Sequence, residues 1–117
     1  MNIEEIQAYC LSKSQTSEDM PFDDSTLVFR VCGKIFALLN LEGKLSINLK
    51  CDPVKAIELR EQYPSIIPGY HMNKIHWNTI ILDDSLDKKL IFELINHSYL
   101  QIVQKLTQKQ KNELLKG

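Results

Sequence analysis

The spacing of hydrophobic residues predicts a helix near the start of the chain. Its apolar face, at helical intervals, is formed by Ile3, Ile6 and Cys10. Asn2 followed by Glu5 is a capping box, in which both side chains bond to free backbone amides of the first turn. We therefore expect a helix that begins after Asn2 and continues to about Lys13, followed by a polar loop over Ser14–Asp24.

A different pattern follows, in which short apolar runs are separated by glycine. The runs Thr26–Cys32 and Ile35–Leu41 are rich in β-branched and apolar residues and meet at Gly33. After Gly43, apolar and polar residues alternate over 45–50, as in a strand with one face in water. Connections this short join antiparallel strands, so the sequence predicts a three-stranded meander.

The next segment predicts a second helix and further strands. Asp52-Pro53 is a typical cap followed by proline in the first helical position, and this helix should end near Gln62. Residues 64–69 contain too many turn-forming residues for regular structure. Residues Tyr70–Leu82 predict one or two strands.

Helical spacing returns in the last third of the chain. A cap at Asp83–Ser85 is expected to start a long helix over Leu86–Leu106. Thr107 with Gln110 forms a second capping box, which is expected to start a short final helix. The order α-β-β-β-α-β(β)-α-α predicts an α+β fold with helices packed on one face of an antiparallel sheet. A length of 117 residues is typical of one domain, so we expect a single domain over 1–117.

Five segments are more specific than these patterns. They are Met20–Phe22, Phe29–Ala37, Leu49–Pro53, Pro68–Thr79 and Ser98-Tyr99, and the fourth contains the unusual run Pro-Gly-Tyr-His-Met-Asn-Lys-Ile-His-Trp-Asn. In these segments and in its order of elements, the chain resembles the MmcQ/YjbR family of small bacterial proteins over nearly its whole length.

The resemblance implies a compact fold similar to frataxin-like and secretion-chaperone-like proteins. It also implies a function, because members of the family are described as predicted DNA-binding proteins with a double-wing motif. It brings no set of catalytic residues to this chain. On this basis we expect a DNA-binding accessory or regulatory protein.

The charge distribution gives this expectation limited support. The chain is 44% hydrophobic and 25% charged, and its net charge of −1 gives no overall attraction to nucleic acid or to an anionic membrane. Residues 1–24 hold six acids and one base, whereas residues 25–82 hold seven bases and four acids. A mildly basic surface can therefore form from the middle of the chain.

Polar and aromatic residues gather around the turn that follows Gly69. The candidate nucleic-acid or ligand-binding residues are His71, Asn73, Lys74, Trp77 and Asn78, together with Lys50 at the end of the alternating strand and Arg30 on the first strand. Lysine, arginine and histidine can contact phosphate, asparagine can bond to a base edge, and an exposed tryptophan can stack on a base. If these side chains converge, they form a binding surface.

Two other interpretations of the same residues remain open. In the first, the polar loop over 70–78 lines a concave pocket beside Trp77 that binds a small ligand or a protein partner. In the second, Trp77 anchors the core, and Asn73 or Asn78 only satisfies backbone amides of the turn. Whether Lys50, Lys74 and Arg30 share one open face distinguishes a nucleic-acid surface from a closed pocket.

The sequence contains no motif for catalysis, a cofactor or a metal. It has no glycine-rich phosphate loop, no nucleophile elbow and no catalytic Cys–His motif, so we expect a protein that is not an enzyme. His71 and His76 lack an identifiable third ligand, and the acidic residues near position 20 do not have EF-hand spacing. The three cysteines are expected to be reduced thiols.

No apolar run approaches the roughly 18–20 residues that cross a bilayer, and the first residues do not resemble a signal peptide. We therefore expect a cytoplasmic protein without a membrane partner. The oligomeric state is left open.

Overall fold

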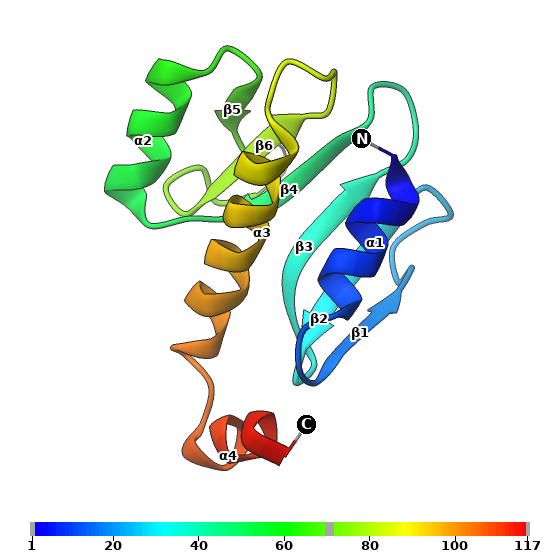
Figure 1. The fold of residues 1–117 in the computed structure, drawn as a ribbon, viewed down its shortest axis with the longest axis vertical. Coiled ribbons are helices and arrows are strands. Elements are labelled where there is room, and N and C mark those ends of the chain that lie inside the picture. Colours follow the sequence, from blue (N-terminus) through cyan, green and yellow to red (C-terminus); the bar gives the residue numbers. More distant parts are fainter. Residues whose placement is uncertain (1, 70–71, 117) are drawn as a thin grey trace.

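The computed structural model describes residues 2–69 and 72–116, and in these residues it contains four helices and six strands (Figure 1). In chain order the elements are α1 (Ile3–Leu11), β1 (Thr16–Asp19), β2 (Thr26–Val31), β3 (Lys34–Asn40), β4 (Ser46–Lys50), α2 (Pro53–Gln62), β5 (Ile66–Pro68), β6 (Trp77–Ile81), α3 (Lys88–Val103) and α4 (Gln108–Lys116). None of the described helices is long and apolar enough to cross a membrane.

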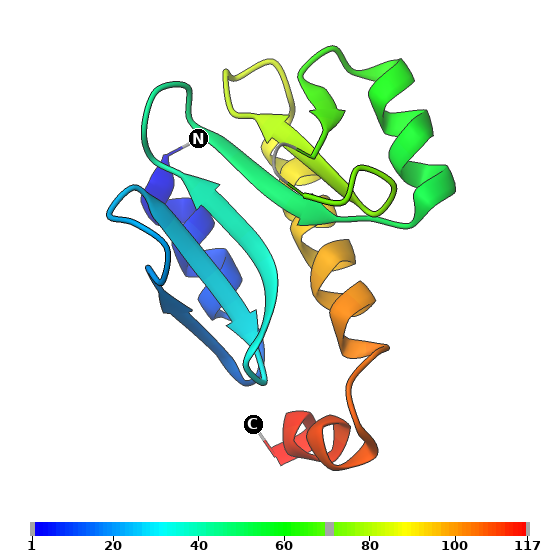
Figure 2. The same ribbon diagram turned by 180° about the vertical axis from the view of Figure 1, so that it is seen from behind.

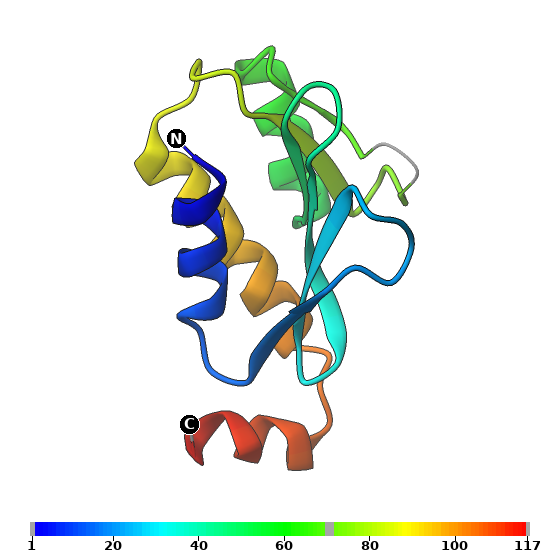
Figure 3. The same cartoon turned by 90° about the vertical axis from the view of Figure 1, so that its right-hand side faces the viewer.

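The strands form one antiparallel sheet in the order β1-β2-β3-β4-β6-β5. Figure 3 shows α1 and α3 against one face of this sheet, while the other face is covered, among the described elements, only by loops. Figures 1 and 2 show α2 beside β5 and α4 below the ends of the strands. The predicted α+β fold, with an antiparallel sheet and its helices on one face, is confirmed.

The hydrophobic core lies between the sheet and the helices. Its largest fully buried side chains include Ile6, Phe29, Phe36, Leu39, Ile47, Ile80 and Ile95. The Phe36 ring packs edge-on against Tyr99 of α3, with ring centroids 5.5 Å apart. The three cysteines are free thiols, and burial raises the pKa of Cys10 to about 12 and that of Cys51 to about 11.

The sheet separates between β3 and β4 where α3 crosses it. The two strands pair only from Ala37 opposite Leu49 to Asn40 opposite Ser46. Beyond the Ala37–Leu49 pair, the fully buried Ser98 of α3 lies between the two strands. Its hydroxyl accepts a hydrogen bond from the Lys50 amide (2.8 Å) and donates one to the Phe36 carbonyl (2.5 Å). One serine therefore satisfies two backbone groups that would otherwise lack partners in the core.

Most of the predicted helix caps are present. Asn2 and Glu5 form the capping box of α1, Asp52 caps α2, and Thr107 with Gln110 caps α4. The predicted cap at Asp83–Ser85 is wrong: α3 begins at Lys88, and the Asp87 carboxylate accepts from the Lys89 amide at 3.1 Å. Residues 83–85 instead form a turn, in which the Ser85 amide donates to Asp83.

Two strands lie in segments for which no regular structure was predicted. The first, β1, lies in the predicted loop and has no apolar alternation, but it pairs along the edge of β2. The second, β5, has three residues and ends at a proline, which an edge strand tolerates. Conversely, the strand expected over residues 70–82 begins only at Trp77 in the described residues.

Candidate functional site

The sheet face opposite the helices carries its own set of side chains, and we call it the open face. Since side chains alternate along each strand, its residues follow from the strand register. They include Thr26, Val28 and Arg30 of β2, Ile35, Leu38 and Asn40 of β3, Ser46, Asn48 and Lys50 of β4, Ile67 of β5, and Trp77, Thr79 and Ile81 of β6.

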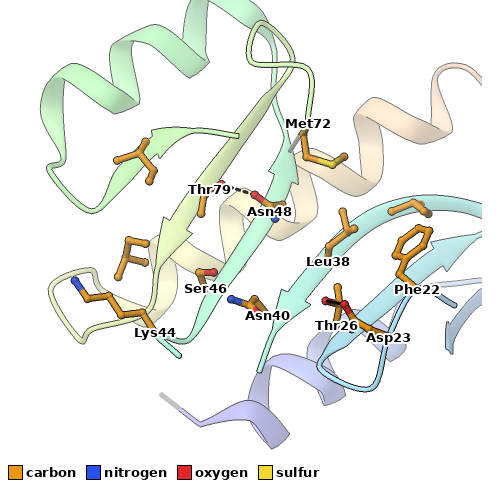
Figure 4. A pocket seen from close by; sticks show the side chains of 13 residues that line it. Phe22, Asp23, Thr26, Leu38, Asn40, Lys44, Ser46, Asn48, Met72 and Thr79 are labelled. Atoms are coloured by element: carbon orange, nitrogen blue, oxygen red, sulfur yellow. Dashed lines mark hydrogen bonds between the residues drawn. The ribbon is translucent and has the colours of Figure 1, made fainter. Parts of the chain in front are cut away.

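Two loops fold over the middle of the open face. One precedes β2 and brings in Phe22 and Asp23, and the other joins β5 to β6 and brings in Met72 (Figures 3 and 4). Leu38 and Thr79 are only 7% and 4% exposed, although no described helix covers them. The loops therefore convert a flat sheet surface into a hollow.

The hollow has a volume of about 660 Å³ and a mixed lining. Its apolar wall consists of Phe22, Ile35, Leu38, Ile67, Met72 and Ile81. Its polar groups come from Thr26, Asn40, Ser46, Asn48 and Thr79, with Asp23 and Lys44 as its charged residues. A concave apolar surface with a few convergent polar groups is typical of a small-molecule site.

Asn48 and Thr79 form the polar centre of the hollow. They lie directly opposite each other on β4 and β6, and the Thr79 hydroxyl donates a hydrogen bond to Asn48 Oδ1 (Figure 4). Within the described residues, the Nδ2 group of Asn48 has no hydrogen-bond acceptor from the protein. Its two N–H groups can therefore bond to a bound molecule.

The two charged residues of the lining differ in how firmly they are held. The Asp23 carboxylate accepts bonds from the Ser25 amide (2.9 Å) and from the hydroxyl of Thr26 (3.4 Å). These bonds, led by that of the Ser25 amide, lower the pKa of Asp23. Lys44 lies in the exposed turn between β3 and β4, so its ammonium group stays in water.

Of the residues predicted from the sequence, Lys50 and Trp77 lie together on the open face. They are directly opposite each other on β4 and β6, and both are half-buried. The ammonium group of Lys105, which follows α3, is near enough to affect the titration of Lys50. Partial burial, and then this second ammonium group, lower the pKa of Lys50.

Arg30 lies on the same face but is already paired. Its Nε group is 3.0 Å from an Asp19 carboxylate oxygen, and its Nη1 group donates to the Gly33 carbonyl at 3.2 Å. These contacts hold the guanidinium against β1 and the β2–β3 turn. Arg30 therefore offers less positive charge to a ligand than the sequence suggested.

The loop between β5 and β6 is organised by Asn73. Its side chain accepts from the Ile75 amide at 2.9 Å, and its carbonyl accepts from the amides of His76 and Trp77. Lys74, between these residues, is exposed at the turn. Asn73 thus has the structural role that was one of the open interpretations, and Lys74 is a solvated lysine. His71 lies outside the described residues.

Asn78 lies on the opposite side of the sheet from the hollow. It is 2% exposed, and its Nδ2 group donates to the Ala56 carbonyl of α2 at 3.3 Å. Its Oδ1 atom is buried without a partner in the described residues and borders a small cavity of about 10 Å³ beside His97. Asn78 therefore attaches α2 to β6 and does not belong to the open-face surface.

Comparison with known proteins places the chain in a family. The YjbR family model matches residues 11–101. The chain belongs to the YjbR family. It is 32% identical to the uncharacterized protein YjbR of Escherichia coli K12, over 98% of both chains. It is also 40% identical to the uncharacterized protein YbdF of Escherichia coli O157:H7, over 83% of this chain and 80% of that one.

Solved structures of related proteins have the same fold. The crystal structure of Deinococcus radiodurans protein DR2400, with domain DUF419, superposes with a TM-score of 0.90 at 38% identity, over 97% of this chain and 87% of that one. A crystal structure from Pseudomonas syringae gives a TM-score of 0.76 at 33% identity, over 86% of this chain and 98% of that one. The YjbR segment of this chain contains every residue that lines the hollow, and it ends before Lys105.

Several residues of the hollow in this YjbR-family chain were not predicted from the sequence. They are Phe22, Leu38, Asn48, Met72 and Thr79. The alternation over residues 45–50 did indicate that Ser46 and Asn48 face away from the core. Nothing local indicated that two loops about 50 residues apart would enclose that face, because the enclosure depends on the sheet order.

Proposed function

We propose that this YjbR-family protein is a non-catalytic binding protein. Its ligand is a small molecule with an apolar body and a hydrogen-bonding edge, and it occupies the hollow on the open face. The observation that carries this proposal is the hollow itself, about 660 Å³ in volume and formed by two loops over an otherwise uncovered sheet face. Small-molecule sites have volumes of roughly 300–1,000 Å³.

The chemistry of the lining supports this class of ligand. Leu38, Ile67 and Met72 provide an apolar surface that gains free energy when a ligand displaces water from it. The Asn48 amide nitrogen provides donors directed toward a polar edge of the ligand. Such a combination fixes the orientation of a ligand as well as its affinity.

The same lining supports binding without catalysis. Among the described residues it contains one carboxylate, that of Asp23, and no cysteine or histidine. Both oxygens of that carboxylate accept bonds from the protein, and its pKa is lowered, so it is a poor general acid or base near neutral pH. Lys44 is exposed, without the burial that would activate a lysine as a nucleophile.

A fragment screen tests the proposal. We expect a subset of small aromatic fragments to raise the melting temperature of the wild-type protein, since a ligand that binds the folded state stabilises it. Phe22→Ala and Met72→Ala should each weaken the best fragment by about tenfold, or ~1.4 kcal/mol. Phe22 is 65% exposed, so its replacement should leave the fold intact.

Leu115→Ala is the matched control for these variants. Leu115 is 87% exposed on α4, which Figure 1 shows below the ends of the strands. No residue of α4 lines the hollow, so this replacement should leave fragment affinity unchanged. Equal affinities for all three variants and the wild type would contradict the proposal.

A second candidate function is nucleic-acid binding, which one observation supports. Lys50 and Trp77 lie opposite each other on the open face, so a phosphate and a stacked base could be held side by side. Against it, Asp19 pairs with Arg30, and Lys74 lies apart in the β5–β6 loop. The net charge of −1 also gives no general attraction to DNA.

Fluorescence anisotropy of labelled duplex and single-stranded DNA across a salt series tests this second function. Saturable binding that falls steeply with salt, and that is weakened by Lys50→Met, would support it. Absence of binding at low salt would exclude it and leave the small-ligand proposal unaffected.

A further inference from the structure

Asn48 is the side chain in the hollow that can distinguish one kind of ligand from another. Its Oδ1 atom already accepts a hydrogen bond from the Thr79 hydroxyl of the neighbouring strand (Figure 4). Its Nδ2 group has no acceptor within the part of the chain that the structure describes, although the side chain is half-buried. Asn48 therefore presents N–H donors to the hollow, while its oxygen is held toward β6.

The other polar side chains that β3 and β4 place in the hollow do not make this distinction. Asn40 is bonded to the main chain of Glu42: its Nδ2 group donates to the carbonyl at 3.1 Å, and its Oδ1 atom accepts from the amide at 3.4 Å. Ser46 carries a hydroxyl, which donates and accepts equally well. The discrimination between an acceptor and a donor on the ligand therefore depends on Asn48.

The charged residues of the described lining offer no free counter-ion at its centre. Both carboxylate oxygens of Asp23 accept hydrogen bonds, one from the Ser25 amide and the other from the Thr26 hydroxyl. Lys44 is exposed in the turn between β3 and β4, and in Figure 4 its side chain extends away from Asn48. A charged ligand would lose its hydration against the apolar wall without gaining a partner. The lining therefore favours an uncharged molecule.

We propose that Asn48 determines the specificity of the hollow, and that the ligand is an uncharged, largely apolar molecule with a hydrogen-bond acceptor such as a carbonyl oxygen. The acceptor bonds to the Asn48 Nδ2 group. The apolar body lies against Met72 and against Leu38, which is directly opposite Asn48 on β3. Thr79 is a positioning residue, because its hydroxyl holds the amide with its donors toward the ligand. This inference rests on the proposed function and specifies the class of its ligand.

Four probes with a common indane body separate shape, hydrogen bonding and charge. The ketone 1-indanone has a carbonyl acceptor, and 1-methyleneindane has nearly the same shape without an acceptor. At neutral pH 1-aminoindane is a cation that only donates, and indane-1-carboxylate is a charged acceptor. In methyl NMR titrations of the full chain, 1-indanone should bind about fivefold or more tightly than 1-methyleneindane, and also more tightly than either ion.

Variants of Asn48 locate the effect. Asn48→Leu should reduce the affinity for 1-indanone to about that for 1-methyleneindane and leave the affinity for 1-methyleneindane nearly unchanged. Asn48→Asp replaces the donors by a carboxylate oxygen, so 1-aminoindane should then bind more tightly than 1-indanone. Asn112→Leu is the matched control at an exposed position of α4, outside the hollow, and should have no effect.

A variant of Thr79 tests the orientation of the amide. Thr79→Val removes the hydroxyl that holds the Asn48 oxygen, so the amide can turn this oxygen toward a ligand. The ratio of the affinities for 1-indanone and 1-aminoindane should fall by about threefold or more. A loss of packing alone would weaken both probes alike. An unchanged ratio would refute the positioning role of Thr79.

The four probes on the wild type give a result that does not depend on how the variants fold. If 1-methyleneindane binds as tightly as 1-indanone, the role of Asn48 is refuted and the hollow stands. If either ion binds more tightly than 1-indanone, the uncharged class of ligand is refuted. If no probe shifts the methyl groups of the hollow at several millimolar, this inference fails. The proposed function fails with it only if the fragment screen also finds no ligand.

Discussion

The two faces of the central sheet are formed by the same strands but are covered in different ways. Leu39 of β3 points toward the helices and is fully buried among side chains of α1 and α3, while its neighbour Leu38 points into the hollow. The helix side is closed by dense packing. The open face is closed only in part, by two loops that leave room for another molecule.

Because the two faces are packed differently, we expect mutations on one face to affect stability and mutations on the other to affect binding. The helix face contains the continuous core, including the aromatic contact of Phe36 with Tyr99. The open face combines apolar side chains with Asn48 and Thr79, a combination that costs stability unless the polar groups are satisfied. Residues of the helix side should therefore affect folding most, and residues of the open face should affect binding most.

The largest expected effect compares the two neighbouring leucines of β3. Leu39→Ala should lower the free energy of unfolding by about 3 kcal/mol, because it leaves a cavity in a closed core. Leu38→Ala should cost about 1–2 kcal/mol, since the hollow is already open to water and no closed cavity remains. Urea denaturation of both variants measures the difference, and equal losses would show that the two faces are packed alike.

A smaller effect is expected at the point where the faces meet. Ser98→Ala should cost about 2 kcal/mol, because the Lys50 amide and the Phe36 carbonyl lose their partner in a buried environment. Ser17→Ala, on the exposed edge strand β1, is the control and should change stability by less than about 0.5 kcal/mol. Equal unfolding free energies for the two variants would contradict the role given to Ser98.

The smallest expected effect is a pH dependence on the helix side. His97 Nε2 accepts a hydrogen bond from the Asp52 amide at 3.1 Å, so the imidazole must be neutral there. Burial, and then the Lys55 charge, lower the pKa of His97, with Asp52 opposing. As the pH falls through the ordinary histidine pKa of about 6.5, the unfolded chain takes up a proton before the folded one, and stability decreases.

Thermal unfolding of the wild type and of His97→Gln between pH 7.5 and 5.5 isolates this contribution. The melting temperature of the wild type should fall more on acidification than that of the variant, since glutamine does not titrate. Parallel curves would mean that His97 is not linked to folding.

The sequence predicted the fold well where local signals were strong. Capping residues such as Asn2 and Asp52 and the alternation over 45–50 each satisfy a local physical requirement, and these elements are present. The strand β1 carries no such signal, because Ser17, Glu18 and Asp19 are polar on both faces of an edge strand. It forms through pairing with β2 and through contacts such as that between Asp19 and Arg30.

The candidate site was predicted only in part, for a geometric reason. Asn78 and Thr79 are adjacent in sequence, but one faces α2 and the other the hollow, and only the register of β6 decides which. Lys50 and Trp77 were predicted as candidates and do lie together.

The most direct test of the central claim is methyl NMR of the protein during titration with the fragment that raises its melting temperature most. Methyl groups report separately on the two faces of each strand. The account predicts that Leu38, Ile67 and Ile81 of the open face shift with saturation, while Ile47 and Ile80 of the helix face do not. Shifts confined to the helix face, or none at concentrations up to several millimolar, would contradict it.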